Sequence, residues 1–177
     1  GFDEFFGIRD GFIDNYNHFF LHGDGFHDLF EGTTEVFHRG QFFPELMVNR
    51  ALKFLDQQQQ SGNTRPFFLY TAFNIPHYPE QALEPHVKLY DHVKEPRRSY
   101  AACVTTTDHY ISKVLSKLDQ TGLRNNTIVI FMSDNGHSAE NYSIRIDNHN
   151  SGYARGHHYG ASGGGGNTGH WVGHKGT

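Results

Sequence analysis

The stretch "NNTIVIFMSDNG", residues 125–136, contains the pattern that decides the fold class. Its run of apolar residues, mostly β-branched or aromatic, predicts a buried strand over residues 125–133. A helical pattern precedes it over residues 96–119, and before that helix "RPFFLYTAF" predicts another buried strand, over residues 65–73. Strand, helix and strand with a crossover of this length are typical of a βαβ unit. The sequence therefore predicts an α/β protein with a mostly parallel sheet sandwiched by helices.

Two helices have clear sequence signals. One is expected to begin at Pro44, where a missing N–H is harmless, and to end in the polar turn of residues 57–63. Its expected buried face consists of Met47, Ala51, Phe54 and Leu55. The crossover helix is expected to stop before Gly122 and to bury Val104, Ile111, Val114, Leu115 and Leu118. Residues 1–43, rich in Phe, Gly, His and Asp, are expected to form long loops with short strands.

Composition excludes several classes of protein. The 177 residues suffice for one domain with a core, and the formal net charge of −4 comes from interspersed charges without a basic block for nucleic acid. The longest apolar runs are much shorter than the ~20 residues of a membrane helix. Cys103 is the single cysteine, so an internal disulfide is impossible. It is expected to be a small buried hydrophobic residue, not a nucleophile.

Both predicted strands end in polar residues that suit a binding site. The first runs into "NIPHYP", where flanking prolines stiffen the backbone of His77, and the second ends at Asp134 and Asn135. Because ligands bind beyond the carboxyl ends of parallel strands, these groups are expected on the same rim. Carboxylate and amide oxygens suit a hard cation such as Ca²⁺. Asp-Asn-Gly is equally good turn sequence, so the tripeptide alone leaves both interpretations open.

The C-terminal loop offers further candidates. Lys175 could reach an anionic substrate as a point charge, although most lysines are simply solvated. His157 and His158 lack a third zinc ligand at a recognisable spacing and are interpreted as lining a substrate cleft. The run "GGGG", residues 163–166, lacks the Gly-Lys-Ser/Thr ending of a phosphate-binding P-loop, so that interpretation is rejected.

An ordered series of motifs resembles the type I, formylglycine-dependent sulfatases of the alkaline-phosphatase-like superfamily. The similar segments are "GFDEFFG" (1–7), "LMVNRALKFLD" (46–56), "RPFFLYTAFNIPHYP" (65–79), "YAACVTTTDHYISKVLSKLDQTGLRNNTIVIFMSDNG" (100–136) and "YGASGGGGNTGHWVGHKGT" (159–177). The resemblance covers essentially the whole chain, and five motifs in order are more specific than any one of them.

The resemblance implies roles for individual residues. Asp134 and Asn135 match two ligands of one Ca²⁺, whose remaining ligands are expected outside this chain. His77 matches the histidine that contacts the sulfate ester and assists the leaving oxygen, and Lys175 matches the lysine that binds the sulfate group. The implied substrate is a sulfated small molecule or a sulfated glycan, with no nucleic acid and no membrane segment. By resemblance, the protein is expected to be exported.

The family's nucleophile is not matched in this sequence. Formylglycine is made from a Cys-x-Pro-Ser-Arg type motif, whereas Cys103 is followed by Val-Thr-Thr. Residues 1–177 are therefore expected to be a partial sulfatase catalytic domain, incomplete at both ends, that lacks the N-terminal nucleophile segment and the C-terminal part. Such a fragment is expected to be inactive by itself, while its parent would be a sulfuric ester hydrolase of the arylsulfatase type.

Two other functions remain open from the sequence. One is a phosphodiesterase or phosphonate hydrolase of the same superfamily. The other is a non-catalytic module that binds sulfated glycans, with the aromatic and His-rich segments 12–38 and 153–174 lining a sugar cleft.

Overall fold

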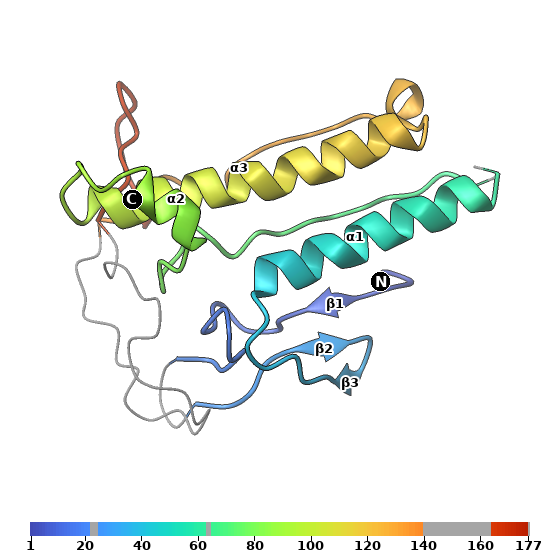
Figure 1. Ribbon diagram of the computed structural model, residues 1–177, viewed down its shortest axis with the longest axis horizontal. Helices are drawn as coiled ribbons and strands as arrows, with labels where there is room; N and C mark the ends of the chain where they lie inside the picture. The colour runs from blue at the N-terminus through green and yellow to red at the C-terminus, as the bar shows by residue number, and fades with distance from the viewer. Residues whose placement is uncertain (22–24, 63–64, 140–163, 177) are drawn as a thin grey trace.

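The computed structural model describes residues 1–21, 25–62, 65–139 and 164–176 (Figure 1). Two long helices lie side by side, and a small sheet lies against the first of them (Figure 1). The elements in chain order are β1 (Phe6–Gly7), β2 (Phe30–Glu31), β3 (Thr34–Glu35), α1 (Phe43–Gln60), α2 (Glu84–Lys88), α3 (Arg97–Gln120) and the 3₁₀ helix η1 (Arg124–Asn126).

The sheet is antiparallel, in contrast to the parallel sheet expected from the sequence. Its order is β1-β2-β3, with Phe6 opposite Glu31 and Phe30 opposite Glu35. These three strands all come from the first 43 residues, for which short strands within loops were expected. Within the described part of the chain, residues 65–73 and 127–133 are extended but form no strand pairs, and residues 125 and 126 of the second predicted strand belong to η1 instead.

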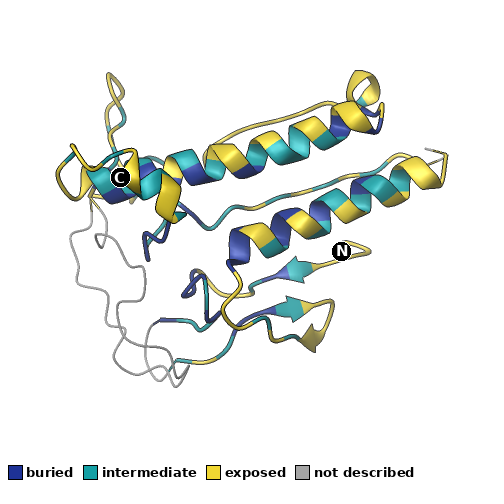
Figure 2. Cartoon of the chain, in the orientation of Figure 1, coloured by how far each residue is buried: buried dark blue, intermediate teal, exposed yellow. Residues whose placement is uncertain are grey.

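Helix α1 confirms the first predicted helix and extends it. Pro44 lies in its first turn, as expected, and Met47, Ala51 and Leu55 are buried on its inner face (Figure 2). The helix continues through the four glutamines to Gln60, because glutamine is a good helix former and nothing before Gly62 interrupts the pattern.

Helix α3 confirms the second predicted helix and part of its predicted buried face, since Leu118 is buried and Val114 and Leu115 pack against core residues. Its buried residues are Ser99, Ala102, Cys103, Thr106, Tyr110 and Leu118, whereas Val104 is 43% exposed. Polar Thr106 lies on the inner face, where its hydroxyl is satisfied by donating to the Ala102 carbonyl at 2.9 Å. Gly122 takes a φ of +71°, a left-handed conformation that suits glycine and terminates the helix.

The core lies where the two long helices meet the N-terminal loops. One cluster joins Ile13, Leu29, Phe43, Val48 and Tyr110, and another joins Leu55 to Leu118 and Leu123 near the far ends of both helices. An ion pair between Lys117 of α3 and Asp56 of α1, at 3.0 Å, lies over the second cluster. Among the described residues, no helix combines the length and the hydropathy needed to span a bilayer.

Residues 65–73 are half-buried, not buried as predicted. Phe67 and Leu69 pack against the second cluster, while Phe68 and Tyr70 are 75% and 68% exposed. This alternation is the period-two pattern of an extended strand that has one face on a hydrophobic layer. The prediction of burial fails because only the helices cover this segment, on one side.

Residues 128–132 depart furthest from the prediction of a buried strand. Ile128, Ile130, Phe131 and Met132 are 78–90% exposed. Successive side chains of a strand point to opposite faces, so neither face of this segment is covered. An apolar run predicts a strand that needs partners on both sides, and the described residues supply none.

Candidate functional site

The C-terminal ends of the two extended segments meet at a cavity of about 350 Å³. Five parts of the chain line it: residues 73–78 with Glu80, Tyr100, residues 133–138, residues 164–168, and Lys175. The cavity therefore brings together His77, Asp134, Asn135 and Lys175, the four described residues that the sequence singled out. Their chemical roles remain predictions.

His77 lies in a loop of residues 74–81, called here the His77 loop. Its Nδ1 lies 2.7 Å from the Tyr78 carbonyl oxygen. A carbonyl can only accept, so Nδ1 carries the hydrogen and Nε2 is the nitrogen that can serve a substrate. The imidazole also stacks on Phe12, with ring centroids 5.1 Å apart and planes 29° apart. Stacking and the Nδ1 bond together fix the orientation of the ring.

Asp134 and Asn135 occupy an exposed turn at the end of residues 128–132. The Asp134 carboxylate accepts from the Asn135 backbone N at 2.9 Å, and the Asn135 side chain donates to the Gly136 carbonyl at 2.7 Å. Because the carboxamide nitrogen is engaged, the Asn135 Oδ1 remains an acceptor beside a carboxylate. This donor set suits a hard cation such as Ca²⁺.

The fit to such a cation is partial. Ca²⁺ takes about six to eight oxygen ligands, and Asp134 and Asn135 supply two residues. Within the described ranges, no group of three or more His, Cys, Asp or Glu side chains is gathered as a metal site. The two residues can therefore form one side of a cation site but not a complete one.

Lys175 is held at the cavity by backbone pairing between two loops. Its N–H donates to the carbonyl oxygen of His137 at 2.9 Å. A Cβ at Gly136 would lie 3.3 Å from the Cα of His174, so the two loops approach closely there. This pairing places a lysine next to the Asp134–Asn135 turn.

The glycine-rich segment forms one wall of the cavity by packing on the start of α3. A Cβ at Gly165 would lie 2.4 Å from the Cβ of Tyr100 and 2.5 Å from the Pro96 carbonyl oxygen, so no side chain fits there. Arg97 donates to the Gly165 carbonyl at 2.9 Å. Glycine is thus required for close packing here.

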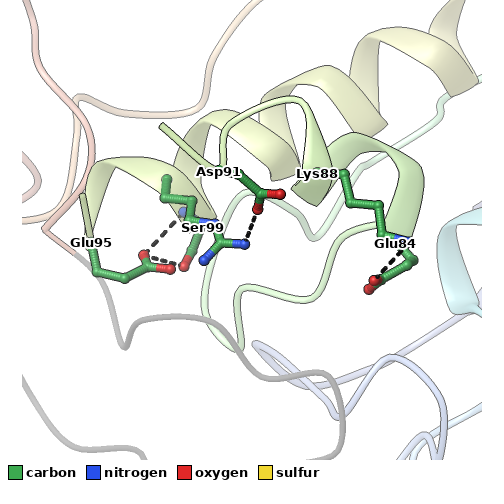
Figure 3. A network of polar contacts seen from close by, with 6 residues as sticks. Glu84, Lys88, Asp91, Glu95 and Ser99 are labelled. Carbon is green, nitrogen blue, oxygen red and sulfur yellow. Dashed lines mark hydrogen bonds and ion pairs between the residues drawn. The ribbon is translucent and has the colours of Figure 1, made fainter. Parts of the chain in front are cut away.

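The beginning of α3 is organised by a polar network (Figure 3). The Glu95 carboxylate accepts from the backbone N of Ser99 at 3.1 Å and from its hydroxyl, and Arg98 pairs with Asp91. A carboxylate at a helix N-terminus satisfies free N–H groups and interacts favourably with the helix dipole. The network therefore fixes the helix end on which the glycine-rich wall rests.

Glu80 is a buried acid at the same cavity, and the sequence analysis did not identify it. Its side chain is 3% exposed, and its Oε2 has no hydrogen-bond partner among the described residues. Burial, aided by the negative charge of Glu95, raises the pKa of Glu80 to about 8. Glu80 is therefore mostly protonated and neutral near pH 7.

Other sequence expectations have clear outcomes. Cys103 is fully buried, and burial raises the pKa of its thiol, so the prediction of a buried, unreactive cysteine is confirmed. His157 and His158 lie outside the described residues. The sequence also missed Tyr100 and Asn74, which line the cavity. Asn74 precedes "IPHYP" directly, and this position was the one available signal for it.

A cavity that combines histidine, lysine and paired carboxylate and carboxamide oxygens has the side chains that can bind an anionic group. Sequence comparison gives the particular family. The Sulfatase family profile matches residues 1–162, and the chain belongs to the sulfatase family.

Individual relatives agree with this assignment. The chain is 33% identical to arylsulfatase J of Mus musculus over 141 residues, which cover 77% of this chain and 23% of that protein. It is 35% identical to N-acetylgalactosamine-6-sulfatase of Canis lupus familiaris over 92 residues, which cover 52% of this chain and 16% of that protein. The chain thus spans about a quarter or less of the length of these relatives.

Solved structures give the same result. The crystal structure of Ps i-CgsB in complex with k-i-k-neocarrahexaose superposes with a TM-score of 0.56 at 32% identity, and covers 61% of this chain and 24% of that one. The sulfatase neighbours support the expected alkaline-phosphatase-like fold at the level of family, while the parallel sheet is not formed by the described residues.

Proposed function

We propose that the whole protein hydrolyses sulfate esters at the cavity described above. The observation that carries the proposal is the convergence of His77, Lys175, Asp134 and Asn135 along one cavity in a chain of the sulfatase family. Hydrolysis breaks the bond between sulfur and the ester oxygen, the leaving oxygen takes up a proton, and water supplies the remaining atoms of the sulfate and alcohol products.

His77 and Lys175 would act on the two ends of the breaking bond. Lys175 is a cation that can attract the sulfuryl oxygens as a point charge. His77, oriented through its Nδ1, can use Nε2 to hold or donate a proton at the leaving oxygen. Such proton transfer contributes roughly 10²–10⁴-fold to rate in enzymes.

Asp134 and Asn135 would hold a divalent cation from one side. When bound, the cation would stabilise negative charge on the sulfuryl oxygens. The two residues contribute oxygen donors in a turn that their own hydrogen bonds already organise. We propose Ca²⁺ because all the donors here are hard oxygens.

The described residues offer no match for a formylglycine nucleophile. Cys103 is fully buried within α3 and is not among the residues that line the cavity. No catalytic step is therefore assigned to a nucleophile from this chain.

We propose a sulfated glycan as the substrate class, acted on by an exported enzyme. The support is a related crystal structure that contains a carrageenan oligosaccharide and relatives named as sulfatases of amino sugars. Release of inorganic sulfate from carrageenan or from a sulfated amino sugar would test the substrate. Recovery of the whole protein outside the producing cell would test the compartment.

The decisive experiment compares Asp134→Ala with Asp108→Ala in the whole protein. Asp108 is exposed on α3 and does not line the cavity, so its removal is a matched control. We expect Asp134→Ala to abolish release of sulfate from 4-nitrophenyl sulfate while circular dichroism stays unchanged. Ca²⁺ should raise the melting temperature of the wild type and of Asp108→Ala, but raise that of Asp134→Ala much less.

Wild-type turnover by Asp134→Ala would contradict the assignment of Asp134 as a ligand. A large preference of the wild type for an aryl phosphodiester over the aryl sulfate would favour the phosphodiesterase alternative. Binding of sulfated glycan without any release of sulfate would favour a non-catalytic binding module.

A further inference from the structure

The His77 loop is held at both of its ends by one side chain. The Nδ2 of Asn74 donates to the Oδ1 of Asn15 at 2.7 Å. At the other end, the backbone N and the Nδ2 of Asn15 both donate to the Oε1 of Gln81, at 2.7 and 3.0 Å. Asn15 therefore bridges the first and the last residue of the loop that carries His77.

Burial makes this bridge stiff. Asn15 and Gln81 are both 0% exposed, so water does not compete for the hydrogen bonds between them. Removing one partner would leave a buried amide unsatisfied, a change that typically costs about 1–3 kcal/mol. The carbonyl of Asn15 also accepts from the backbone N of Phe43, the first residue of α1, at 2.8 Å. Asn15 is thus fixed to the helix and in turn holds the loop.

The same N-terminal segment contacts the middle of the His77 loop. Phe12, which is 8% exposed, stacks on the imidazole of His77 and makes an edge contact with Tyr78 at a centroid distance of 4.9 Å. Phe12 and Asn15 together define three points of the loop: its two ends and the ring of its histidine.

We propose that Asn15 is a positioning residue for the reaction at this cavity, because it fixes the span of the His77 loop and so sets where the imidazole lies relative to the bound ester. The proposal rests on the proposed function. Asn15 does not line the cavity and acts through the loop that carries His77. A proton donor must lie within about 2.6–3.2 Å of the atom it protonates, and a misplacement of about 1 Å can lower a rate ~10²-fold.

The chain offers a matched control two residues away. Asn17 is also buried, at 3% exposure, but neither its Nδ2 nor its Oδ1 has a hydrogen-bond partner among the described residues. Asn15→Ala and Asn17→Ala therefore remove the same buried side chain from the same segment. Only the first removes the bridge to Asn74 and Gln81.

The test measures kcat of the whole protein on two esters that differ in their need for a proton. Phenyl sulfate has a poor leaving group and depends on protonation of the leaving oxygen, whereas 4-nitrophenyl sulfate depends on it much less. We expect Asn15→Ala to lower kcat on phenyl sulfate about 10–100-fold and on 4-nitrophenyl sulfate by less than a third of that factor. Asn17→Ala should change both substrates by the same small factor.

A second readout does not depend on turnover. The imidazole proton resonances of His77, assigned by comparison with His77→Gln, should shift or broaden in Asn15→Ala and stay in place in Asn17→Ala. If Asn15→Ala does not fold, Asn15→Asp keeps the acceptor for Asn74 but loses the Nδ2 donor to Gln81, and should show the same changes at smaller size.

The outcomes separate this inference from the proposed function. If Asn15→Ala lowers kcat equally on both esters, or leaves the His77 resonances unchanged, the positioning role of Asn15 is overturned even in an active sulfatase. A wild type that releases sulfate neither from these esters nor from a sulfated glycan would overturn the proposed function, and the role of Asn15 in the reaction with it. The His77 resonances would then report only whether Asn15 holds the loop.

Discussion

Replacing Glu80 by glutamine should make the stability of the protein less sensitive to pH between about 5 and 8. Burial raises the pKa of Glu80 from 4.5 to about 8 in the folded state. Between these values the folded protein binds a proton that the unfolded chain has lost, so the free energy of unfolding falls as pH rises. The stabilising contribution is complete below pH 4.5 and is lost as pH rises through 8. Glutamine cannot titrate and removes this slope.

The size of the effect follows from the pKa difference. A shift of about 3.5 units at about 1.36 kcal/mol per unit gives a ceiling near 5 kcal/mol. Glu80 is 3% exposed but borders a cavity of about 350 Å³ that water can enter, and this hydration reduces the penalty for its charge. We therefore expect about 2 kcal/mol of wild-type stability to be lost between pH 5 and pH 8 through this group.

Urea unfolding followed by circular dichroism at several pH values measures this difference. The quantity of interest is the stability of Glu80→Gln minus that of the wild type, because the titration of other groups cancels in it. This difference should rise by about 2 kcal/mol from pH 5 to pH 8. Glu4→Gln, at an exposed glutamate, should leave it flat. A flat difference for Glu80→Gln would refute a buried, protonated Glu80.

Three further substitutions test other features of the structure. Gly165→Ala should lower the free energy of unfolding, measured with urea, by about 1–3 kcal/mol, because its Cβ would lie 2.4 Å from Tyr100 in the first turn of α3. Gly11→Ala is the control and should be nearly neutral, because nothing lies within 4 Å of its Cβ. Burial lowers the pKa of His18 to about 4, so its contribution to stability is present above pH 6.5 and lost as pH falls through 4. Asparagine tolerates the φ of 64° at this position. His18→Asn should therefore make the melting temperature fall less steeply as pH is lowered below 6.5. Ile130→Lys should change the free energy of unfolding by less than about 0.5 kcal/mol, because the side chain is 79% exposed. If concentrated protein associates through this exposed apolar segment, the substitution should also reduce light scattering. Unchanged scattering would argue against association through this segment.

The long helices were predictable because their signals are local. Pro44 at the start of α1, Gly122 after α3 and apolar residues at helical spacing all act within a few residues of each other. Burial was less predictable. The pattern placed Val104 on the inner face of α3, but Thr106 lies on that face, with its hydroxyl satisfied by the preceding turn.

The extended segments show what an apolar run can and cannot predict. Residues 65–73 and 127–133 are extended, as their composition indicates, but burial depends on neighbouring strands that no local pattern contains. The expectation that their C-terminal ends lie together came from a general property of α/β folds, and the structure does place His77 and Asp134 along one cavity. The parallel pairing assumed in that reasoning is not seen in the described residues.

Glu80 and Asn15 could not have been found from the sequence. A glutamate in a loop is ordinarily exposed, and only the packing of the folded chain makes Glu80 a buried acid. Asn15 lies in a Phe- and His-rich segment without periodicity, and its partners are 59 and 66 residues away along the chain. Such contacts depend on the complete fold.

The long separation between Asn15 and its partners has a consequence for the order of folding. Closing a chain segment of about sixty residues costs more conformational entropy than forming a helix turn, and contacts of this kind tend to form after local structure. Helices α1 and α3 can form early, whereas the His77 loop reaches its final shape only when the N-terminal segment has docked. Amide hydrogen exchange should therefore show the loop opening at a lower free energy than the helix interiors. A destabilised variant would lose the geometry around His77 before it lost its helical content.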